Sequence, residues 1–235
     1  MKRVKYKDLG STSYQDALIS QVEAQEALVD RKLKIRDGKI TDKNDLIHTL
    51  FFCEHTPVYT LGRSGSIDNL LFSASELNKK GIEFYKTNRG GDITYHGPGQ
   101  IVGYPIFDLD DFYHDVHRYV REIEEVIIRT MKDFGIQASR IDGLTGVWIK
   151  GEGSDPDRKI CAIGVHISRW VTLHGFALNV NTELQYFEGI VPCGISEDSK
   201  TVTSMQKELG HTVDFDKVKA SLLNNFKKVF DLRFI

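Results

Sequence analysis

Residues 89–100, RGGDITYHGPGQ, are the segment that most restricts what this chain can fold into. Four glycines and a proline in twelve positions make poor strand material, because glycine adds no side-chain packing and loses much backbone entropy on folding. We expect such a stretch in a sheet only where the backbone passes very close to another group. A bound ligand is the obvious candidate, and a glycine-rich hairpin without function is the alternative.

The same segment could hold a ligand through its backbone and its two ends. N–H groups freed at tight bends can bind a phosphate, a carbonyl or a developing oxyanion. Arg89 and His96 add polar side chains at either end. The common nucleotide-binding signatures are absent, since the sequence has neither a GxxxxGK[ST] phosphate loop nor a GxGxxG after a strand. A net charge of -2 also argues against nucleic acid as a default partner.

Length and composition are those of an ordinary globular protein. The chain has 235 residues, of which 40% are hydrophobic and 27% charged, so it can bury a large core as one domain. No apolar run approaches the about 18 residues of a membrane span, and the first residues lack the apolar stretch of a secretory leader. Three scattered cysteines form neither a disulfide framework nor a CxxC zinc pair. These features favour a cytosolic or organelle-matrix protein, with the cytoplasm as the predicted location.

Hydrophobic periodicity predicts both helices and strands. Apolar residues recur at three- or four-residue steps in three segments, 18–33, 112–134 and 214–231. Thr12, with Gln15 three residues later, predicts a capping box before the first helix. Short runs rich in β-forming residues predict strands at 46–55, 82–87, 93–109, 146–150, 159–167 and 171–180. Without repeats or linkers, this pattern indicates a single α+β domain over residues 1–235 with a mixed or antiparallel sheet.

Several motifs, in one order along the chain, resemble the lipoyl(octanoyl) transferases. They are EHTPVYTLGR at 54–63, RGGDITYHGPGQ at 89–100, RKICAIGVHI at 158–167, LHGFALNV at 173–180 and GIVPCGI at 189–195. Together they cover most of the chain, and several motifs in register are more specific than any one alone. The resemblance implies a fold similar to the catalytic domain of biotin and lipoate protein ligases. That fold is a mixed β-sheet backed by helices, with the active site at one edge of the sheet.

The resemblance also implies a ping-pong acyl transfer through Cys193 and Lys159. Cys193 in PCG matches the cysteine that takes octanoyl from octanoyl-acyl carrier protein, and Lys159 matches the lysine beside it. The implied acceptors are lysines on the lipoyl domains of 2-oxoacid dehydrogenases and on the glycine cleavage H protein. A free cysteine with a pKa near ~8.5 is only a few per cent ionised at neutral pH, so a neighbouring amine can favour the reactive thiolate. Converting a thioester to an amide is downhill, and neither ATP, another cofactor nor a metal is expected.

Three short stretches are implied to form the acyl pocket. Small side chains and bare backbone leave room for an eight-carbon tail, which gains about 0.8 kcal/mol per buried methylene. Backbone N–H groups near Cys193 and the Gly90–Gly91 bend are candidates for an oxyanion hole. The implied substrate-binding residues are Arg89, Gly90, Gly91, Asp92, Ile93, Thr94, Tyr95, His96, Ala162, Ile163, Gly164, Gly175, Phe176 and Ala177.

The other cysteines and several histidines have simpler interpretations. Cys53 and Cys161 lie in apolar runs, which predicts that they pack inside strands. His114 and His117 are three apart on a predicted helix and could bind a metal, but no third ligand is apparent. A solvated helix face is the better interpretation of that pair. His174 precedes GFA and is expected near the site, without a catalytic role.

Two other functions stay open at this point. An ATP-dependent lipoate or biotin protein ligase would use the same fold, but it would activate its acid as an acyl-adenylate and need no covalent cysteine. A binding module that has lost catalysis is disfavoured, because both Cys193 and Lys159 are present. Acyl carrier proteins are acidic, so a basic surface near the pocket is expected. Lys79, Lys80 and Lys86 are candidates by sequence proximity, although a solvated face is the simpler interpretation.

Overall fold

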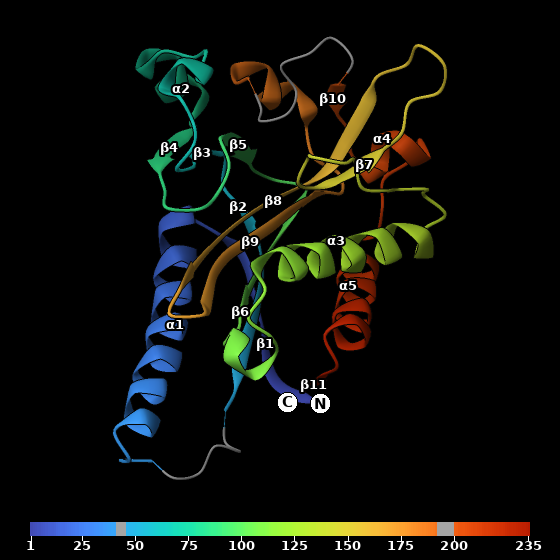
Figure 1. Ribbon diagram of the computed structural model, residues 1–235. Helices are drawn as coiled ribbons and strands as arrows, with labels where there is room; N and C mark the ends of the chain where they lie inside the picture. Colours follow the sequence, from blue (N-terminus) through green and yellow to red (C-terminus); the bar gives the residue numbers. More distant parts are fainter. Residues whose placement is uncertain (41–45, 192–199) are drawn as a thin grey trace.

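A computed structural model describes residues 1–40, 46–191 and 200–235 (Figure 1). Their strands are β1 Lys2–Thr12, β2 His48–His55, β3 Val58–Leu61, β4 Glu83–Lys86, β5 Ile93–His96, β6 Gln100–Ile106, β7 Val147–Ile149, β8 Asp157–Ser168, β9 Val171–Asn179, β10 Lys200–Val202 and β11 Leu232–Phe234. The larger, eight-stranded sheet has the order β10-β8-β9-β6-β2-β1-β11, with β7 paired to β8. The smaller sheet has the order β4-β3-β5.

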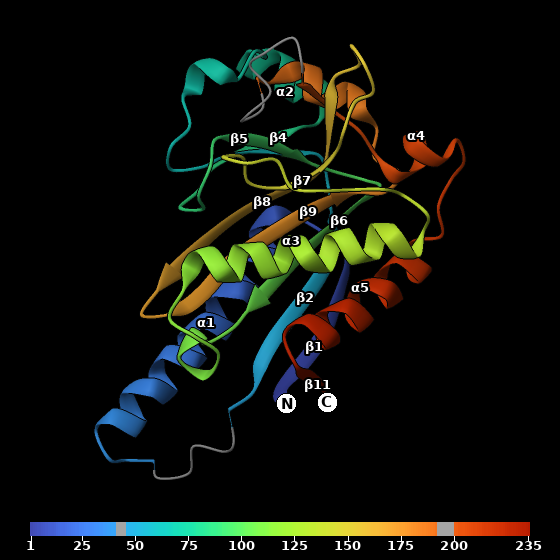
Figure 2. The ribbon, with the colours of Figure 1, turned by 45° about the vertical axis from the view of Figure 1, so that its right-hand side comes forward.

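Helices cover both faces of the larger sheet. The α-helices are α1 Tyr14–Arg36, α2 Ala74–Lys80, α3 Val116–Asp133, α4 Met205–Leu209 and α5 Phe215–Val229, and the short 3-10 helices are η1 Ile67–Asn69, η2 Leu109–Asp111 and η3 Leu184–Gly189. Helices α3 and α5 lie on one face and α1 lies on the other, as the turned view shows (Figure 2). Among the described residues, no helix combines the length and apolar character needed to cross a bilayer.

Side-chain caps set where the three long helices begin. The Ser13 hydroxyl accepts the Asp16 N–H at 3.1 Å, and the carboxylates of Asp115 and Asp214 cap α3 and α5 in the same way. The predicted capping box at Thr12 is therefore wrong by one residue. Thr12 still pairs with β2 as the last residue of β1, so the helix can start only after it. The prediction of three long helices is confirmed.

The larger sheet is mixed, which confirms the predicted α+β fold class. Strands β2, β6, β9 and β8 pair antiparallel, whereas β1 pairs parallel with both β2 and β11, and β10 pairs parallel with β8. The predicted strand 93–109 is two strands in two sheets, because β5 pairs with β3 and β6 pairs with β2. The glycine-rich turn at 97–99 carries the chain from the small sheet to the large one.

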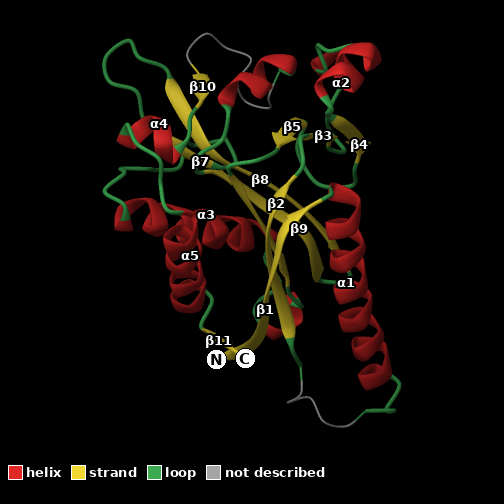
Figure 3. Cartoon of the chain, turned by 180° about the vertical axis from the view of Figure 1, so that it is seen from behind, coloured by secondary structure: helices red, strands yellow, loops and turns green. Residues whose placement is uncertain are grey.

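Alternation along the strands divides the core between the two faces. Phe51 and Phe52 are neighbours in β2, yet Phe51 packs with the α1 side and Phe52 with the α3 and α5 side. The view from behind shows α1 on one side of the strands and α3 with α5 on the other (Figure 3). A third cluster, containing Tyr59 and Tyr95, fills the space between the small sheet and η3. The glycine-rich segment lies where this third cluster meets β8 and β9.

Candidate functional site

The glycine-rich segment lies against strand β8, beyond the end of β7. The N–H of Gly90 donates to the Val165 carbonyl at 2.9 Å. Gly164 has to be small, because a Cβ at this position would lie 2.7 Å from the Gly90 carbonyl oxygen. The close backbone approach expected from the glycines is therefore made with the protein's own strand.

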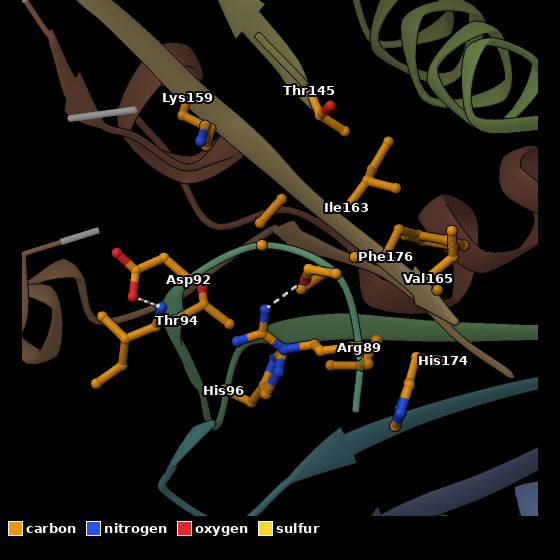
Figure 4. Close-up of a pocket in the computed structure, with 18 of the residues that line it drawn as sticks. Arg89, Asp92, Thr94, His96, Thr145, Lys159, Ile163, Val165, His174 and Phe176 are labelled. Atoms are coloured by element: carbon orange, nitrogen blue, oxygen red, sulfur yellow. Dashed lines mark hydrogen bonds between the residues drawn. The ribbon is translucent and has the colours of Figure 1, made fainter. Parts of the chain in front are cut away.

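A pocket of about 350 Å³ opens between this segment and strands β8 and β9 (Figure 4). This volume lies within the range of about 300–1,000 Å³ typical of small-molecule sites. Lys159 lines the pocket together with all but one of the predicted binding residues. They are Arg89, Gly90, Gly91, Asp92, Ile93, Thr94, His96, Ala162, Ile163, Gly164, Gly175, Phe176 and Ala177. We call the side formed by residues 89–96 the glycine wall.

Tyr95 is the predicted binding residue that the structure keeps out of the pocket. Strand neighbours alternate, so Thr94 and His96 face the pocket while Tyr95 faces away. Its ring is fully buried and stacks on Tyr186, with centroids 4.9 Å apart. It packs against Phe187 as well, at 5.5 Å. Tyr95 thus supports the glycine wall from behind.

Lys159 stands at one end of the pocket. Its backbone pairs with Trp148 in β7 on one side and with Val202 in β10 on the other. Its ammonium Nζ lies 4.5 Å from the centroid of the fully buried Trp148 ring, within cation–π distance. The loop at 150–156, which ends two residues earlier than the polar stretch 151–158 suggests, therefore still allows Lys159 to reach the site.

Cys193 lies outside the described residues, within 192–199. In the sequence this stretch joins η3 to β10. Phe187 in η3 and Val202 in β10 both line the pocket. The role implied for Cys193 stays a prediction.

The sequence does not single out the other residues that line the pocket. They are Tyr14, Gln100, Val102, Tyr104, Val120, Gly143, Leu144, Thr145, Val165, Asn179, Phe187 and Val202. Gln100 and Asn179 stand within the motifs RGGDITYHGPGQ and LHGFALNV, so a signal for them was present. Tyr14 and Thr145 come from distant parts of the chain and carry no local signal.

Buried neutral histidines lie in the pocket and behind it. His174 lies in the pocket as expected, and burial, with a further contribution from Arg89, lowers its pKa to about 3. Burial lowers the pKa of His55, behind the pocket, to about 4. The pKa of His96 is well below its usual value, mainly through burial and also through the nearby His55 and Arg89. All three rings are neutral near pH 7.

Arg89 and Asp92 hold the glycine wall in shape. Arg89 is 8% exposed and donates through Nε to the Thr60 hydroxyl at 3.1 Å and through Nη1 to the Gly90 carbonyl at 3.0 Å. The Asp92 carboxylate accepts the Ile93 N–H at 2.7 Å and a second hydrogen bond from the Asn69 amide. Both side chains line the pocket and fix its backbone at the same time.

A buried carboxylate holds the side of the pocket that faces the glycine wall. Glu124 in α3 is fully buried, and its Oε1 accepts the Gly146 N–H at 3.0 Å. Its Oε2 accepts from Arg121 at 2.7 Å and from Arg140 at 3.0 Å. Residues 143–145, which we call the loop wall, directly precede Gly146 and line the pocket.

The remaining predictions on cysteines and histidines have mixed outcomes. Cys53 and Cys161 are buried as predicted, and burial raises the pKa of each thiol. His114 and His117 do not share a helical face, because α3 begins only at Val116 and His114 bonds Asp110 at 2.6 Å. Across residues 1–40, 46–191 and 200–235, no three metal-binding side chains cluster.

The lysines suggested for donor docking lie on the small-sheet side of the molecule. Lys79 and Lys80 are exposed in the last turn of α2, and Lys86 is exposed at the end of β4. Lys80 Nζ lies 5.1 Å from the centroid of the Phe72 ring. A role for these lysines in docking stays a prediction.

Known proteins match this chain over most of its length. A family model, the lipoyl protein ligase A/B catalytic domain, matches residues 22–227. An octanoyltransferase of Cytophaga hutchinsonii is 52% identical over 231 residues, covering 98% of this chain and 94% of the relative. An octanoyltransferase of Flavobacterium johnsoniae is 48% identical over 235 residues, covering 100% of this chain and 99% of the relative.

A solved structure shows the same fold at low sequence identity. It is a bipartite lipoate protein ligase from Thermoplasma acidophilum, studied with its E2 lipoyl domain. It superposes with a TM-score of 0.68 at 16% identity, covering 100% of this chain and 86% of that one. At this identity the similarity concerns the fold alone.

Proposed function

The chain belongs to the octanoyltransferase family, and from that premise we propose that it moves octanoyl through a thioester on Cys193 with the help of Lys159. The enzyme transfers octanoyl groups in protein lipoylation. The donor we infer is octanoyl-acyl carrier protein. The acceptors are lysine ε-amines of the lipoyl domains of 2-oxoacid dehydrogenases and of the glycine cleavage H protein. We infer one catalytic domain over residues 1–235, acting in the cytoplasm, where a free thiol stays reduced.

One observation carries the mechanism: the Lys159 amine and the three predicted acyl-binding stretches line the same pocket. Apolar and small groups on β8 and β9, such as Ile163, Phe176 and Ala177, supply a surface for a hydrocarbon tail. Each buried methylene of that tail contributes about 0.8 kcal/mol. An amine at the end of such a surface is close to where the tail's carbonyl group would lie.

The first half-reaction forms the enzyme thioester. The Cys193 thiolate attacks the carbonyl carbon of the donor thioester, a new C–S bond forms, and the carrier's thiolate leaves and takes up a proton. A neighbouring ammonium favours the attacking thiolate by charge attraction and can supply that proton. Lys159 is the amine we assign to this role.

The second half-reaction transfers the group to the acceptor. A neutral lysine amine attacks the enzyme thioester, an amide C–N bond forms, and the Cys193 thiolate leaves. The amine loses one proton in this step, and neutral Lys159 can accept it. Atoms and charges balance without ATP, since a thioester is converted to a more stable amide.

An ATP-dependent ligase is the less well supported hypothesis. The relatives near 50% identity are named octanoyltransferases, whereas the ligase is 16% identical and shares the fold. A ligase would also have no use for a thiolate as acyl carrier.

Intact-protein mass spectrometry with octanoyl-acyl carrier protein tests this mechanism. The wild type is expected to gain one octanoyl group without ATP, and Cys193→Ser is expected to gain none. Lys159→Met should load about 10²–10⁴-fold more slowly, the usual range for losing a general acid or base. Cys53→Ala is the matched control and should load normally, because Cys53 is buried outside the pocket. Octanoyl found on Cys193→Ser, or a requirement for ATP, would contradict the mechanism.

A further inference from the structure

A chain of hydrogen bonds begins at Arg89 on the glycine wall. Its Nε and Nη2 donate to the Thr60 hydroxyl at 3.1 and 2.9 Å. The Thr60 hydroxyl lies 3.3 Å from His96 Nε2, and His96 Nδ1 lies 2.8 Å from Gln100 Oε1. Arg89, Thr60, His96 and Gln100 are each at most 8% exposed, so water does not compete for these contacts.

The chain continues across the larger sheet to the backbone of Lys159. Gln100 Nε2 donates to Asn179 Oδ1 at 2.9 Å, and Asn179 Nδ2 donates to the Thr203 carbonyl at 2.9 Å. The Thr203 N–H then donates to the Lys159 carbonyl at 2.9 Å. Asn179 is 4% exposed and Thr203 is fully buried. Thr203 directly follows β10, so the chain fixes β10 against β8 at the level of Lys159.

The orientation of the Gln100 amide fixes the proton on one nitrogen of His96. Gln100 Nε2 donates twice, to the Tyr95 carbonyl at 3.2 Å and to Asn179 Oδ1. Its Oε1 therefore faces His96 and can only accept. His96 Nδ1 must carry the hydrogen of this bond.

The Thr60 hydroxyl fixes the other ring nitrogen, Nε2, as an acceptor without a proton. Its oxygen already accepts two hydrogen bonds from Arg89, which leaves its own hydrogen as the group to share. The His96 Nε2 beside it accepts that hydrogen. Every link from the guanidinium to the Lys159 carbonyl then donates in one direction.

We propose that His96, as a neutral Nδ1–H imidazole, is a positioning residue whose hydrogen-bond chain holds strand β10 and the Lys159 backbone in place for acyl transfer. The functional part of this inference rests on the role proposed above for Lys159. A proton on Nε2 would set two donors against each other at Thr60, and loss of the Nδ1 proton would set two acceptors against each other at Gln100. The burial that lowers the pKa of His96 favours the same neutral form.

Nitrogen-15 NMR of the full-length enzyme tests the tautomer directly. With labelled histidine and His96→Asn to assign the signal, we expect His96 to show a protonated Nδ1 and a bare Nε2 from pH 6 to 8. A protonated Nε2, or a charged ring at pH 7, would overturn the inference. This readout does not depend on whether Lys159 takes part in the chemistry.

Kinetics of octanoyl transfer test the positioning role. Removing the link in His96→Ala should lower kcat about ten- to hundredfold with little change in KM for the donor, because small displacements of reacting groups have effects of that size. His96→Asn can place an amide N–H near the position of Nδ1. On a logarithmic scale, its loss of kcat should therefore be at most half of the loss in His96→Ala. Equal kcat losses in these two variants, at equal thermal stability, would overturn the role.

A buried histidine elsewhere supplies the matched control. His48 is fully buried, accepts the Asp108 N–H at 3.2 Å and lies outside the pocket. His48→Asn should lower the melting temperature without changing kcat, and a kcat loss equal to that of His96→Ala would count against the inference. A fully active Lys159→Met variant with an unchanged His96 spectrum would uphold the hydrogen-bond chain and overturn only the proposed role of Lys159.

Discussion

The glycine wall and the loop wall face the same pocket but are held by different chemistry. Behind the glycine wall, directed hydrogen bonds run from the buried Arg89 guanidinium through the neutral side chains of His96 and Gln100, each with a fixed donor and acceptor. The loop wall depends on one carboxylate, Glu124, which accepts from two arginines and from the Gly146 N–H. The glycine wall is held by a chain in which every hydrogen-bonding group needs its partner. The loop wall is held by a cluster around one carboxylate.

This difference predicts how each wall fails. The neutral links of the chain, His96 and Gln100, are broken by a proton or by a misplaced amide, because either creates an unsatisfied buried polar group. The ionic cluster is broken by removing the Glu124 carboxylate, which leaves the buried Gly146 N–H without an acceptor. The side chains of Arg121 and Arg140 are 46% and 33% exposed, so Glu124 carries the only fully buried charge of these three residues. Mutation and pH therefore separate the two walls.

The largest expected effect is on the loop wall. Glu124→Leu should lower the free energy of unfolding by about 2–4 kcal/mol, because it leaves the buried Gly146 N–H without an acceptor and removes the charge-assisted hydrogen bonds to Arg121 and Arg140. Urea denaturation measures this change. Arg129→Ala is the control, because its pair with Glu125 is 47% and 32% exposed and should contribute less than about 1 kcal/mol.

A second variant separates charge from shape in the same cluster. Glu124→Gln keeps an oxygen for the Gly146 N–H but loses the negative charge, so its cost should fall between those of Glu124→Leu and Arg129→Ala. A loss for Glu124→Leu no greater than for Arg129→Ala would mean that the loop wall is held by packing and not by this carboxylate.

Acid should act instead on two buried histidines, His174 in the pocket and His55 behind it. His55 and His174 have folded pKa values of about 4 and 3, below the ordinary value near ~6.5. Below pH ~6.5 the unfolded state therefore binds more protons, and stability that is complete above this pH is lost as the pH falls toward the folded values. Each ring should cost about 1.4 kcal/mol per pH unit, or about 2 kcal/mol between pH 6.5 and 5.

Urea denaturation at pH 8, 6.5 and 5 measures this slope. His55→Gln should flatten it by about the share of one histidine, since glutamine cannot take up the proton. Equal stability of the wild type at all three pH values would show that these rings do not stay neutral in the folded protein.

The fold could be predicted where the apolar periodicity is strong and where paired strands are neighbours in the sequence. Helix α3 and the β8–β9 pair were found because their apolar patterns are long and regular. Strand β1, KRVKYKDLGST, was missed because most of its residues are polar, and pairing with β2 and β11 is what makes it a strand. Its structure depends on neighbours that a local pattern does not contain.

The site residues also divide into those that the sequence indicates and those that only the packed structure brings to the pocket. The glycines at 89–100 alone indicate a close backbone approach, whereas Gly164 is implied only by the resemblance; the structure shows that these two segments contact each other. Tyr95 was included because a motif does not state which side chains face the pocket, which the alternation in β5 decides. Tyr14 and Thr145 were missed because only the packed structure brings them there.

The smallest expected effect concerns the contact that joins the glycine wall to β8. A methyl group at Gly164 would lie 2.7 Å from the Gly90 carbonyl oxygen, whereas a methyl group at Gly90 would lie 3.3 Å from the Val165 carbonyl oxygen. Both contacts are with backbone, so the crowding in Gly164→Ala can be relieved only by moving the wall.

We therefore expect Gly164→Ala to lower the free energy of unfolding by about 1–3 kcal/mol and Gly90→Ala to cost less. Gly164→Ala should also raise KM for octanoyl-acyl carrier protein, because the displaced glycine wall no longer fits the acyl chain as well. Urea denaturation and steady-state kinetics on the two variants measure both effects. If Gly90→Ala proved as harmful as Gly164→Ala, the 2.7 Å approach of a methyl group at Gly164 to the Gly90 carbonyl oxygen would not be what sets the cost of a methyl group at this contact.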